Sequence, residues 1–143
     1  MDEATFWAII DRIDRARIAY DESAAVEPLV DALTGMARAE IASFEDHLAR
    51  RLRDLDTPRH AGEAGESSGS AEAFLHARCF VVAQGEAHFR AVLADPSQMP
   101  RSSDEWCEAL LGVATAANEN ANGVRVRFVT TVIDEGRVRG RFR

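Results

Sequence analysis

The sequence predicts an all-α fold of about six helices in a compact bundle, followed by a strand-like or β-hairpin extension at the C-terminus. Apolar residues recur at three- and four-residue steps through most of the chain, and turn-forming residues separate these periodic stretches. After Asn122-Gly123 the period changes to alternation, which is typical of strands. We therefore divide the chain into a helical domain over residues 1–123 and a basic C-terminal extension over residues 124–143.

The first helix is expected to extend from about residue 6 to residue 20, because the apolar residues of this stretch share one helical face. Asp2 or Thr5 is placed to cap its N-terminus. The residues on the apolar face are Phe6, Ile9, Ile10, Ile13, Ala16 and Tyr20.

A second and a third helix follow, and the three are expected to stack in antiparallel order. Ser23 is placed as the N-cap of the second helix, Pro28 would be tolerated near its first turn, and Gly35 would end it. Three arginines lie near the C-terminal end of the third helix, where the helix dipole favours positive charge. The apolar faces consist of Ala25, Val26, Leu29, Val30 and Leu33 in the second helix, and of Ile41, Phe44, Leu48, Leu52 and Leu55 in the third.

Residues 56–69 lack helical periodicity and contain Pro58 and three glycines, so we expect a mobile loop there. Ser70 is then placed as the N-cap of a helix that ends at Gly85. The apolar positions of that helix are Phe74, Ala77 and Val81, with Phe80 beside them.

Two further helices complete the expected domain. A short one over residues 86–94 stops at Asp95-Pro96, because the residue before a proline avoids helical angles. The last begins at Ser103, and its inward residues are Trp106, Leu110, Val113, Ala114 and Ala117.

The charge is distributed unevenly along the chain. Residues 124–143 hold six arginines against Asp134 and Glu135, a net +4, which leaves −11 for residues 1–123 out of the total of −7. The acidic body makes nucleic acid an unlikely partner, because affinity for phosphates depends on basic residues. A hairpin is marginal by itself, so the extension is expected to pack on the body or to cross to a second copy in a homodimer.

Composition and motifs exclude several classes of protein. No apolar stretch approaches the length of a transmembrane helix, and the first residues do not resemble a secretion signal, so we expect a cytoplasmic protein. Cys79 and Cys107 lie in helix-like apolar patterns and are interpreted as core residues. Because all 17 basic residues are arginine, no lysine chemistry is available. No zinc motif and no phosphate loop is present, so no metal and no cofactor is expected.

A family resemblance covers residues 5 to about 120. The stretches that carry it are Phe6-Trp7-x-x-Ile10, Glu40-Ile41-x-x-Phe44, Phe74-x-x-x-Arg78-x-Phe80-Val81-Val82-x-Gln84-Gly85 and Ala94-Asp95-Pro96. With these stretches the chain resembles the bacterial family called domain of unknown function 4240, and this resemblance implies an all-helical fold without an established activity. Ala71 and Phe80 depart from the family pattern, as does the polar run over residues 62–69, so a ligand site shared by the family would be altered or lost here.

Arg78 is the first candidate for a ligand-binding residue, because a guanidinium among apolar neighbours needs a carboxylate or another anion as its partner. The alternative is an internal salt bridge, for which Glu72, Asp95 and Glu40 are possible partners. Gln84 is a second ligand-binding candidate, and its alternative role is that of a helix terminus, with Gly85 in a left-handed cap.

Glu72 and His76 are the candidate catalytic residues, should the protein be an enzyme. They stand four apart on one expected helix, which places a carboxylate beside an imidazole as in a general acid/base pair. The alternative is an exposed pair that only supports the helix.

Two functions remain open at this point. The first is a small cytoplasmic binding or interaction protein that recognises a peptide or a small anionic group. The second is a small cofactor-free tailoring enzyme that acts on a peptide or metabolite in a bacterial biosynthetic pathway, with Glu72, His76 and Arg78 lining its pocket.

Overall fold

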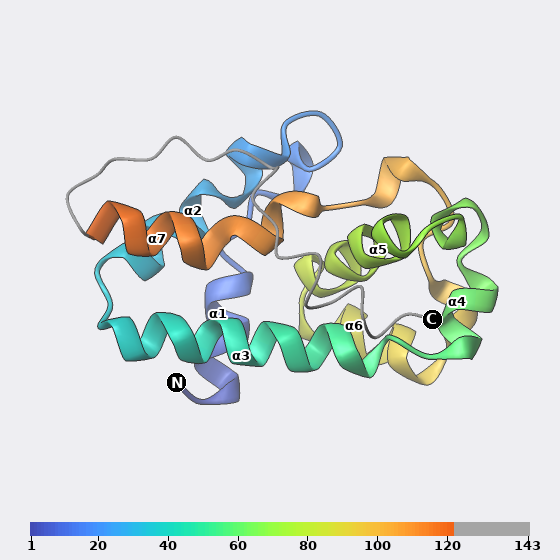
Figure 1. Cartoon of the computed structure of the whole chain (residues 1–143), viewed down its shortest axis with the longest axis horizontal. Coiled ribbons are helices and arrows are strands. Elements are labelled where there is room, and N and C mark those ends of the chain that lie inside the picture. Colours follow the sequence, from blue (N-terminus) through green and yellow to red (C-terminus); the bar gives the residue numbers. More distant parts are fainter. Residues whose placement is uncertain (122–143) are drawn as a thin grey trace.

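The computed structural model describes residues 1–121, which form seven α-helices and five short 3₁₀ helices, without a strand (Figure 1). The predicted all-α fold is therefore confirmed, whereas the strand-like extension predicted over residues 124–143 lies outside the described residues. No helix in the described part of the chain is long and apolar enough to span a membrane. The elements are α1 (Glu3–Ile10), η1 (Arg15–Arg17), α2 (Glu22–Thr34), α3 (Arg38–Asp54), α4 (Pro58–Glu63), η2 (Gly65–Ser68), α5 (Ala71–Ala83), α6 (Glu86–Ala94), η3 (Pro96–Gln98), η4 (Ser103–Glu105), η5 (Glu108–Gly112) and α7 (Val113–Ala121).

The long helix α3 runs along one side of the molecule (Figure 1). Helix α7 packs against α2 and α3, and α5 packs against α3 and α6. The segment between α6 and α7, residues 95–112, starts at η3, which contacts α4 and α6, and then runs past α5, which η4 and η5 contact (Figure 1). The largest apolar side chains that this arrangement buries completely are Phe6, Phe44, Phe74, Phe89, Ile10, Leu29, Leu33, Ile41, Leu55 and Leu110.

The first helix is shorter than its apolar spacing predicts. Asp2 caps α1 by accepting the Thr5 N–H, as expected, but the helix ends at Ile10 rather than near residue 20. Tertiary hydrogen bonds override the helical spacing: the Asp14 N–H donates to the Ala25 carbonyl, and the Arg15 side chain donates to the Ala83 carbonyl. Tyr20 is consequently 74% exposed instead of buried.

Helices α2 and α3 follow the predicted apolar faces, all of whose residues are buried. The predicted N-cap of α2 is wrong, because Asp21 accepts the Ala24 N–H and Ser23 already lies within the helix. Pro28 lies well inside α2, farther from its N-terminus than expected, and Gly35 forms its C-cap as predicted.

The mobile loop predicted over residues 56–69 is wrong, because this stretch folds into α4 and η2. Thr57 caps α4 by accepting the His60 N–H, and Pro58 occupies the first turn, where a missing N–H costs nothing. The buried His60 ring donates through Nε2 to the Val92 carbonyl at 2.9 Å and accepts the Thr57 hydroxyl at Nδ1. A cap and a tertiary anchor thus compensate for the low periodicity.

Helices α5 and α6 agree with the expected ends. Ser70 caps α5 by accepting the Ala73 N–H, and the short helix covers residues 86–94 as predicted. Gly85 joins the two helices with φ +102° and ψ 172°, an extended positive-φ conformation rather than the left-handed helical cap that the sequence predicted. This region of backbone space is essentially confined to glycine.

The last helix begins later than predicted. Ser103 does begin a helical turn, η4, but Trp106 is extended and α7 starts only at Val113. Two backbone amides are held by partners elsewhere in the chain: Cys107 donates to the His76 carbonyl, and Ala109 donates to the Glu22 carboxylate. Trp106 and Cys107 therefore interrupt the helical path between η4 and η5, and η5 packs against α5.

Candidate functional site

Arg78 is buried within the fold, with 1% of its surface exposed. Its Nη1 donates a hydrogen bond to the Leu52 carbonyl at 2.9 Å and lies 3.9 Å from Oδ2 of Asp56. The guanidinium also lies over the Phe74 ring, 4.5 Å from its centroid. This geometry corresponds to the internal salt bridge that the sequence left open, with Asp56 as a carboxylate partner that the sequence did not suggest.

An external anion would have difficulty reaching Arg78. The Asp56 side chain, which is only 8% exposed, already supplies a negative charge next to the guanidinium. A ligand carboxylate would have to displace Asp56 from the protein interior and leave that charge unpaired, which is costly. The recognition of a ligand is therefore better sought elsewhere in the molecule.

His76 and Glu72, which stand one turn apart on α5, differ in their surroundings. Glu72 is exposed, whereas the His76 side chain is only 10% exposed. Nε2 of His76 lies 3.1 Å from Oε1 of Glu108, whose side chain is 26% exposed. This contact is an ion-pair distance without hydrogen-bond geometry, and Nε2 is buried without a hydrogen bond to any described residue.

Glu22, at the start of α2, places a second carboxylate near His76 and Glu108. Its Oε1 accepts the Ala109 N–H at 3.0 Å, which fixes the carboxylate beside η5. Burial raises the pKa of Glu22 above its ordinary value, and the nearby charge of Glu108 raises it further, whereas the Ala109 hydrogen bond and His76 oppose the shift. The Glu22 carboxyl group therefore keeps its proton to a higher pH than an ordinary glutamate does.

Trp106 forms the edge of this arrangement. Its indole Nε1 donates to the buried Ser67 hydroxyl at 2.9 Å, and its ring centroid lies 5.8 Å from that of His76. The side chain is half-buried: it packs against the hydrophobic core, as its spacing predicted, and part of it reaches the surface. We call Glu22, His76, Trp106 and Glu108 the Glu–His–Trp cluster.

The Glu–His–Trp cluster combines groups that attract a positive charge. Two partly exposed carboxylates match the fork of a guanidinium or the donors of an ammonium group, and an indole ring adds a cation–π contact. An imidazole close to a carboxylate is also a pairing that general bases use. No group of three or more His, Cys, Asp and Glu side chains in residues 1–121 is arranged to hold a metal ion.

Sequence reasoning found only one member of this cluster. His76 was singled out for its spacing from Glu72, but Glu22, Trp106 and Glu108 come from distant elements. The Ala109–Glu22 hydrogen bond joins residues 87 positions apart, and no local pattern indicates such a contact. The sequence shows that Glu22 and Glu108 are acidic, but it does not show that they lie close together in the fold.

Gln84 has the role of a helix terminus, the alternative that the sequence left open. It is the C-cap of α5, and its backbone N–H is shared between the Phe80 and Val81 carbonyls. The adjacent Gly85 N–H donates to the Val82 carbonyl. These backbone contacts place the Gln-Gly pair at the end of α5, and ligand binding by the Gln84 side chain stays a prediction.

The two cysteines are buried, as predicted. Burial raises the pKa of the Cys79 thiol to about 12 and that of Cys107 well above its ordinary value. Since the thiolate is the reactive form, both thiols are poor nucleophiles and poor metal ligands in the folded protein.

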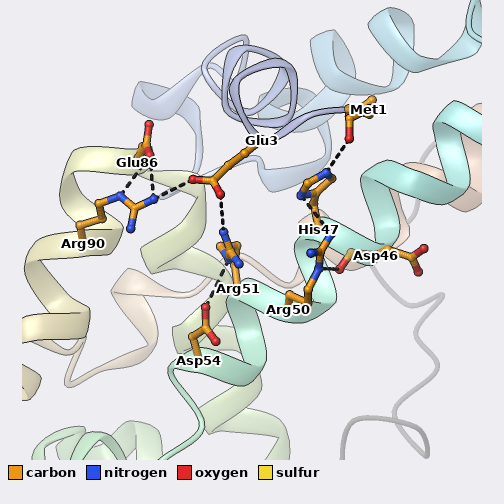
Figure 2. Close-up of polar contacts among 9 residues, drawn as sticks. All are labelled: Met1, Glu3, Asp46, His47, Arg50, Arg51, Asp54, Glu86 and Arg90. Atoms are coloured by element: carbon orange, nitrogen blue, oxygen red, sulfur yellow. Dashed lines mark hydrogen bonds and ion pairs between the residues drawn. The ribbon is translucent and has the colours of Figure 1, made fainter.

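A second polar cluster joins α1, α3 and α6 (Figure 2). The Glu3 carboxylate accepts hydrogen bonds from Arg90 at 2.7 Å and from Arg51 at 3.4 Å. Arg90 also pairs with Glu86, and Arg51 pairs with Asp54. These contacts satisfy opposite charges within the cluster, so they fasten the N-terminal helix to the body, with a modest contribution from each exposed pair.

His47 forms the other end of the contacts drawn in Figure 2. Its Nε2 donates to the Met1 carbonyl at 2.8 Å, which leaves Nδ1 to accept from Arg50 at 3.4 Å. The ring also stacks on Phe6, with centroids 5.4 Å apart. Both ring nitrogens are therefore engaged in holding the first residues against α3.

Comparison with known proteins gives one match. A family profile described as "Protein of unknown function (DUF4240)" matches residues 1–120. No curated protein and no solved structure matches the chain.

Proposed function

The chain belongs to the DUF4240 family of proteins of unknown function, and from that premise we propose that it is a small binding protein that recognises a basic group of a peptide through the Glu–His–Trp cluster. The observation that carries this proposal is the meeting of the Glu22 and Glu108 carboxylates at His76, whose ring centroid lies 5.8 Å from that of the partly buried Trp106.

The position of the carboxylates favours binding of a cation. Burial has already removed part of the water around Glu22, so a bound guanidinium would gain more there than at a fully hydrated carboxylate. The bound charge would also relieve the repulsion between Glu22 and Glu108. The net charge of −11 over residues 1–123 attracts cationic ligands toward the surface.

A peptide that carries an arginine fits the chemistry of the cluster. Its guanidinium would pair with the carboxylates and stack on the indole, while the rest of a short peptide would lie along residues 101–105, which are mostly exposed. We further propose that the protein acts in a bacterial cytoplasm, which the arginine-only, alanine-rich composition supports.

Calorimetric titration of the full chain with three short peptides tests this proposal. Acetyl-Gly-Arg-Gly-amide supplies the basic group, acetyl-Gly-citrulline-Gly-amide replaces it with a neutral isostere, and acetyl-Gly-Glu-Gly-amide supplies an anion. We expect binding of the arginine peptide only. Its affinity should fall by about tenfold or more in Glu22→Gln/Glu108→Gln, because each charge-assisted hydrogen bond contributes about 1.5–3 kcal/mol.

Glu27→Gln is the matched control, because Glu27 is an exposed residue on the same helix as Glu22. An equal loss of affinity in Glu27→Gln would show that only net charge matters and would overturn the proposed site. Binding of the glutamate peptide that disappears in an Arg78→Met variant shown by circular dichroism to be folded would instead support the small anionic ligand that the sequence suggested.

A second candidate function is the cofactor-free tailoring enzyme, which the His76–Glu108 contact favours. A carboxylate 3.1 Å from an imidazole can orient it as a general base for a substrate held at the cluster. Incubation of the protein with a peptide library, followed by mass spectrometry, would then reveal a product that His76→Gln fails to form. A product made equally by His76→Gln would exclude this role for His76.

A further inference from the structure

We propose that in the free protein the Glu–His–Trp cluster is occupied by an arginine of the chain's own basic extension, from residues 137–143. This inference rests on the proposed function, because it names the first occupant of the same site. An external basic peptide would then have to displace this internal arginine before it could bind.

Charge complementarity is the first support. The last seven residues, Arg137-Val138-Arg139-Gly140-Arg141-Phe142-Arg143, contain four arginines and no acidic residue. The cluster offers two carboxylates, and the nearby exposed residues Asp104 and Glu105 extend the negative surface. A guanidinium pairs with carboxylates through two parallel hydrogen bonds, and it stacks on indole rings better than other cations do.

The length of the extension is the second support. Helix α7 ends at Ala121, and Arg137 follows 16 residues later. A chain of that length spans up to about 55 Å at roughly 3.3–3.6 Å per residue. A compact domain of this size has a radius of gyration of about 14 Å, so the arginines can reach any part of its surface.

Tethering makes even a weak contact effective. A tether of about 16 residues gives a local concentration on the order of 1 mM at a site within its reach. An arginine that binds the cluster with millimolar affinity would therefore occupy it for much of the time. The extension would then act as an internal competitor that sets a threshold for external peptides.

The test uses full-length protein in which Arg137, Arg139, Arg141 and Arg143 are all changed to glutamine. The readout is the dissociation constant for acetyl-Gly-Arg-Gly-amide. We expect this quadruple variant to bind the peptide about twofold or more tightly than the unaltered protein, because an internal competitor present at about its own dissociation constant halves the apparent affinity. The matched control changes four exposed arginines of the body to glutamine, namely Arg12, Arg38, Arg53 and Arg59.

The outcomes separate the two proposals. If both the unaltered protein and the quadruple variant bind the peptide with equal affinity, the internal contact is overturned and the proposed function stands. If neither protein binds the peptide, the proposed function itself fails. An equal gain in the control variant would assign the effect to net charge and would also overturn the internal contact.

Light scattering on the same proteins distinguishes a monomer from a dimer. An internal contact predicts that the unaltered protein and the quadruple variant have the same mass in solution. A dimer that the four substitutions dissociate would overturn the intramolecular form and would support the exchange of extensions between two copies that the sequence suggested.

Discussion

Nη1 of Arg78 donates a hydrogen bond to the carbonyl oxygen of Leu52 at 2.9 Å, although the two residues are 26 positions apart on different helices. Leu52 lies in the last turn of α3, where backbone carbonyls have no partner within the helix. Arg78 therefore caps α3 from the side, and Asp56 balances its charge. The family motif residue Arg78 thus has a structural role that connects α5 to the end of α3.

Replacing Arg78 by methionine should destabilise the fold. The substitution keeps an apolar stem but removes the hydrogen bond to Leu52 and leaves the nearly buried Asp56 carboxylate without this cation. Removing one partner of a buried pair costs about 3 kcal/mol or more, so we expect a loss of that size in the free energy of unfolding, measured in urea. The double variant Arg78→Met/Asp56→Asn should recover part of the loss, and a single variant that loses less than about 1 kcal/mol would contradict this role.

Alanine at Gly85 should also destabilise the protein. The backbone at Gly85 has φ +102°, and an added Cβ would lie 3.1 Å from both the Arg15 guanidinium and the Asp11 carboxylate. We expect Gly85→Ala to lower the free energy of unfolding by about 1–3 kcal/mol. Gly62→Ala is the control, because Gly62 lies within α4 with nothing near its Cβ position, and it should stabilise the protein by about 0.5–1 kcal/mol. Equal effects of both substitutions would refute the special role of Gly85.

The two candidate caps of α2 give opposite expectations. The Asp21 carboxylate accepts the Ala24 N–H at 3.1 Å, whereas Ser23 lies within the helix. Asp21→Ala should therefore lower the free energy of unfolding by about 1 kcal/mol, while Ser23→Ala should change it by less than about 0.5 kcal/mol. Thermal and urea unfolding of both variants would measure the difference, and a larger effect at Ser23 would restore the cap that the sequence predicted.

The fold was predictable wherever a local signal coincided with the packing. The apolar faces of α2 and α3, the Ser70 cap of α5 and the bounds of α6 all depend on residues within a few positions of one another. The predictions that were wrong concern segments whose structure depends on particular hydrogen bonds rather than on apolar periodicity. Residues 11–20 continue a helical pattern but are held by contacts with Ala25 and Ala83, and the glycine-rich stretch 56–69 is helical because Thr57 and His60 anchor it.

The candidate site was predictable only in part, for the same physical reason. The spacing of Glu72 and His76 indicated that a carboxylate could lie beside the imidazole, but the carboxylate at 3.1 Å is that of Glu108, which arrives from the segment that crosses α5. Arg78 was expected to need a carboxylate, and Asp56 lies just past the end of another helix. Spacing along one helix identifies which face a residue occupies, and only the packing of helices decides what that face meets.

The carboxyl group of Glu22 should make stability depend on pH in an uncommon direction. Burial, with the charge of Glu108, raises its pKa above the ordinary value of 4.5, so the folded protein binds this proton more tightly than the unfolded chain does. Stability from this group is therefore fully present below about pH 4.5 and is lost as the pH rises through the folded pKa. Glu22→Gln keeps an oxygen that can accept the Ala109 N–H but cannot ionise, so this variant should lose no stability by that route.

Urea unfolding at several pH values between 4 and 5.5 measures this effect, within a range that lies below the ordinary titration of histidine near about 6.5. The unaltered protein should become less stable relative to Glu22→Gln as the pH rises across this range. Glu27→Gln, which removes an exposed carboxyl group from the same helix, should run parallel to the unaltered protein. If the Glu22→Gln curve also runs parallel, the pKa of Glu22 is not raised by folding, which would contradict this prediction.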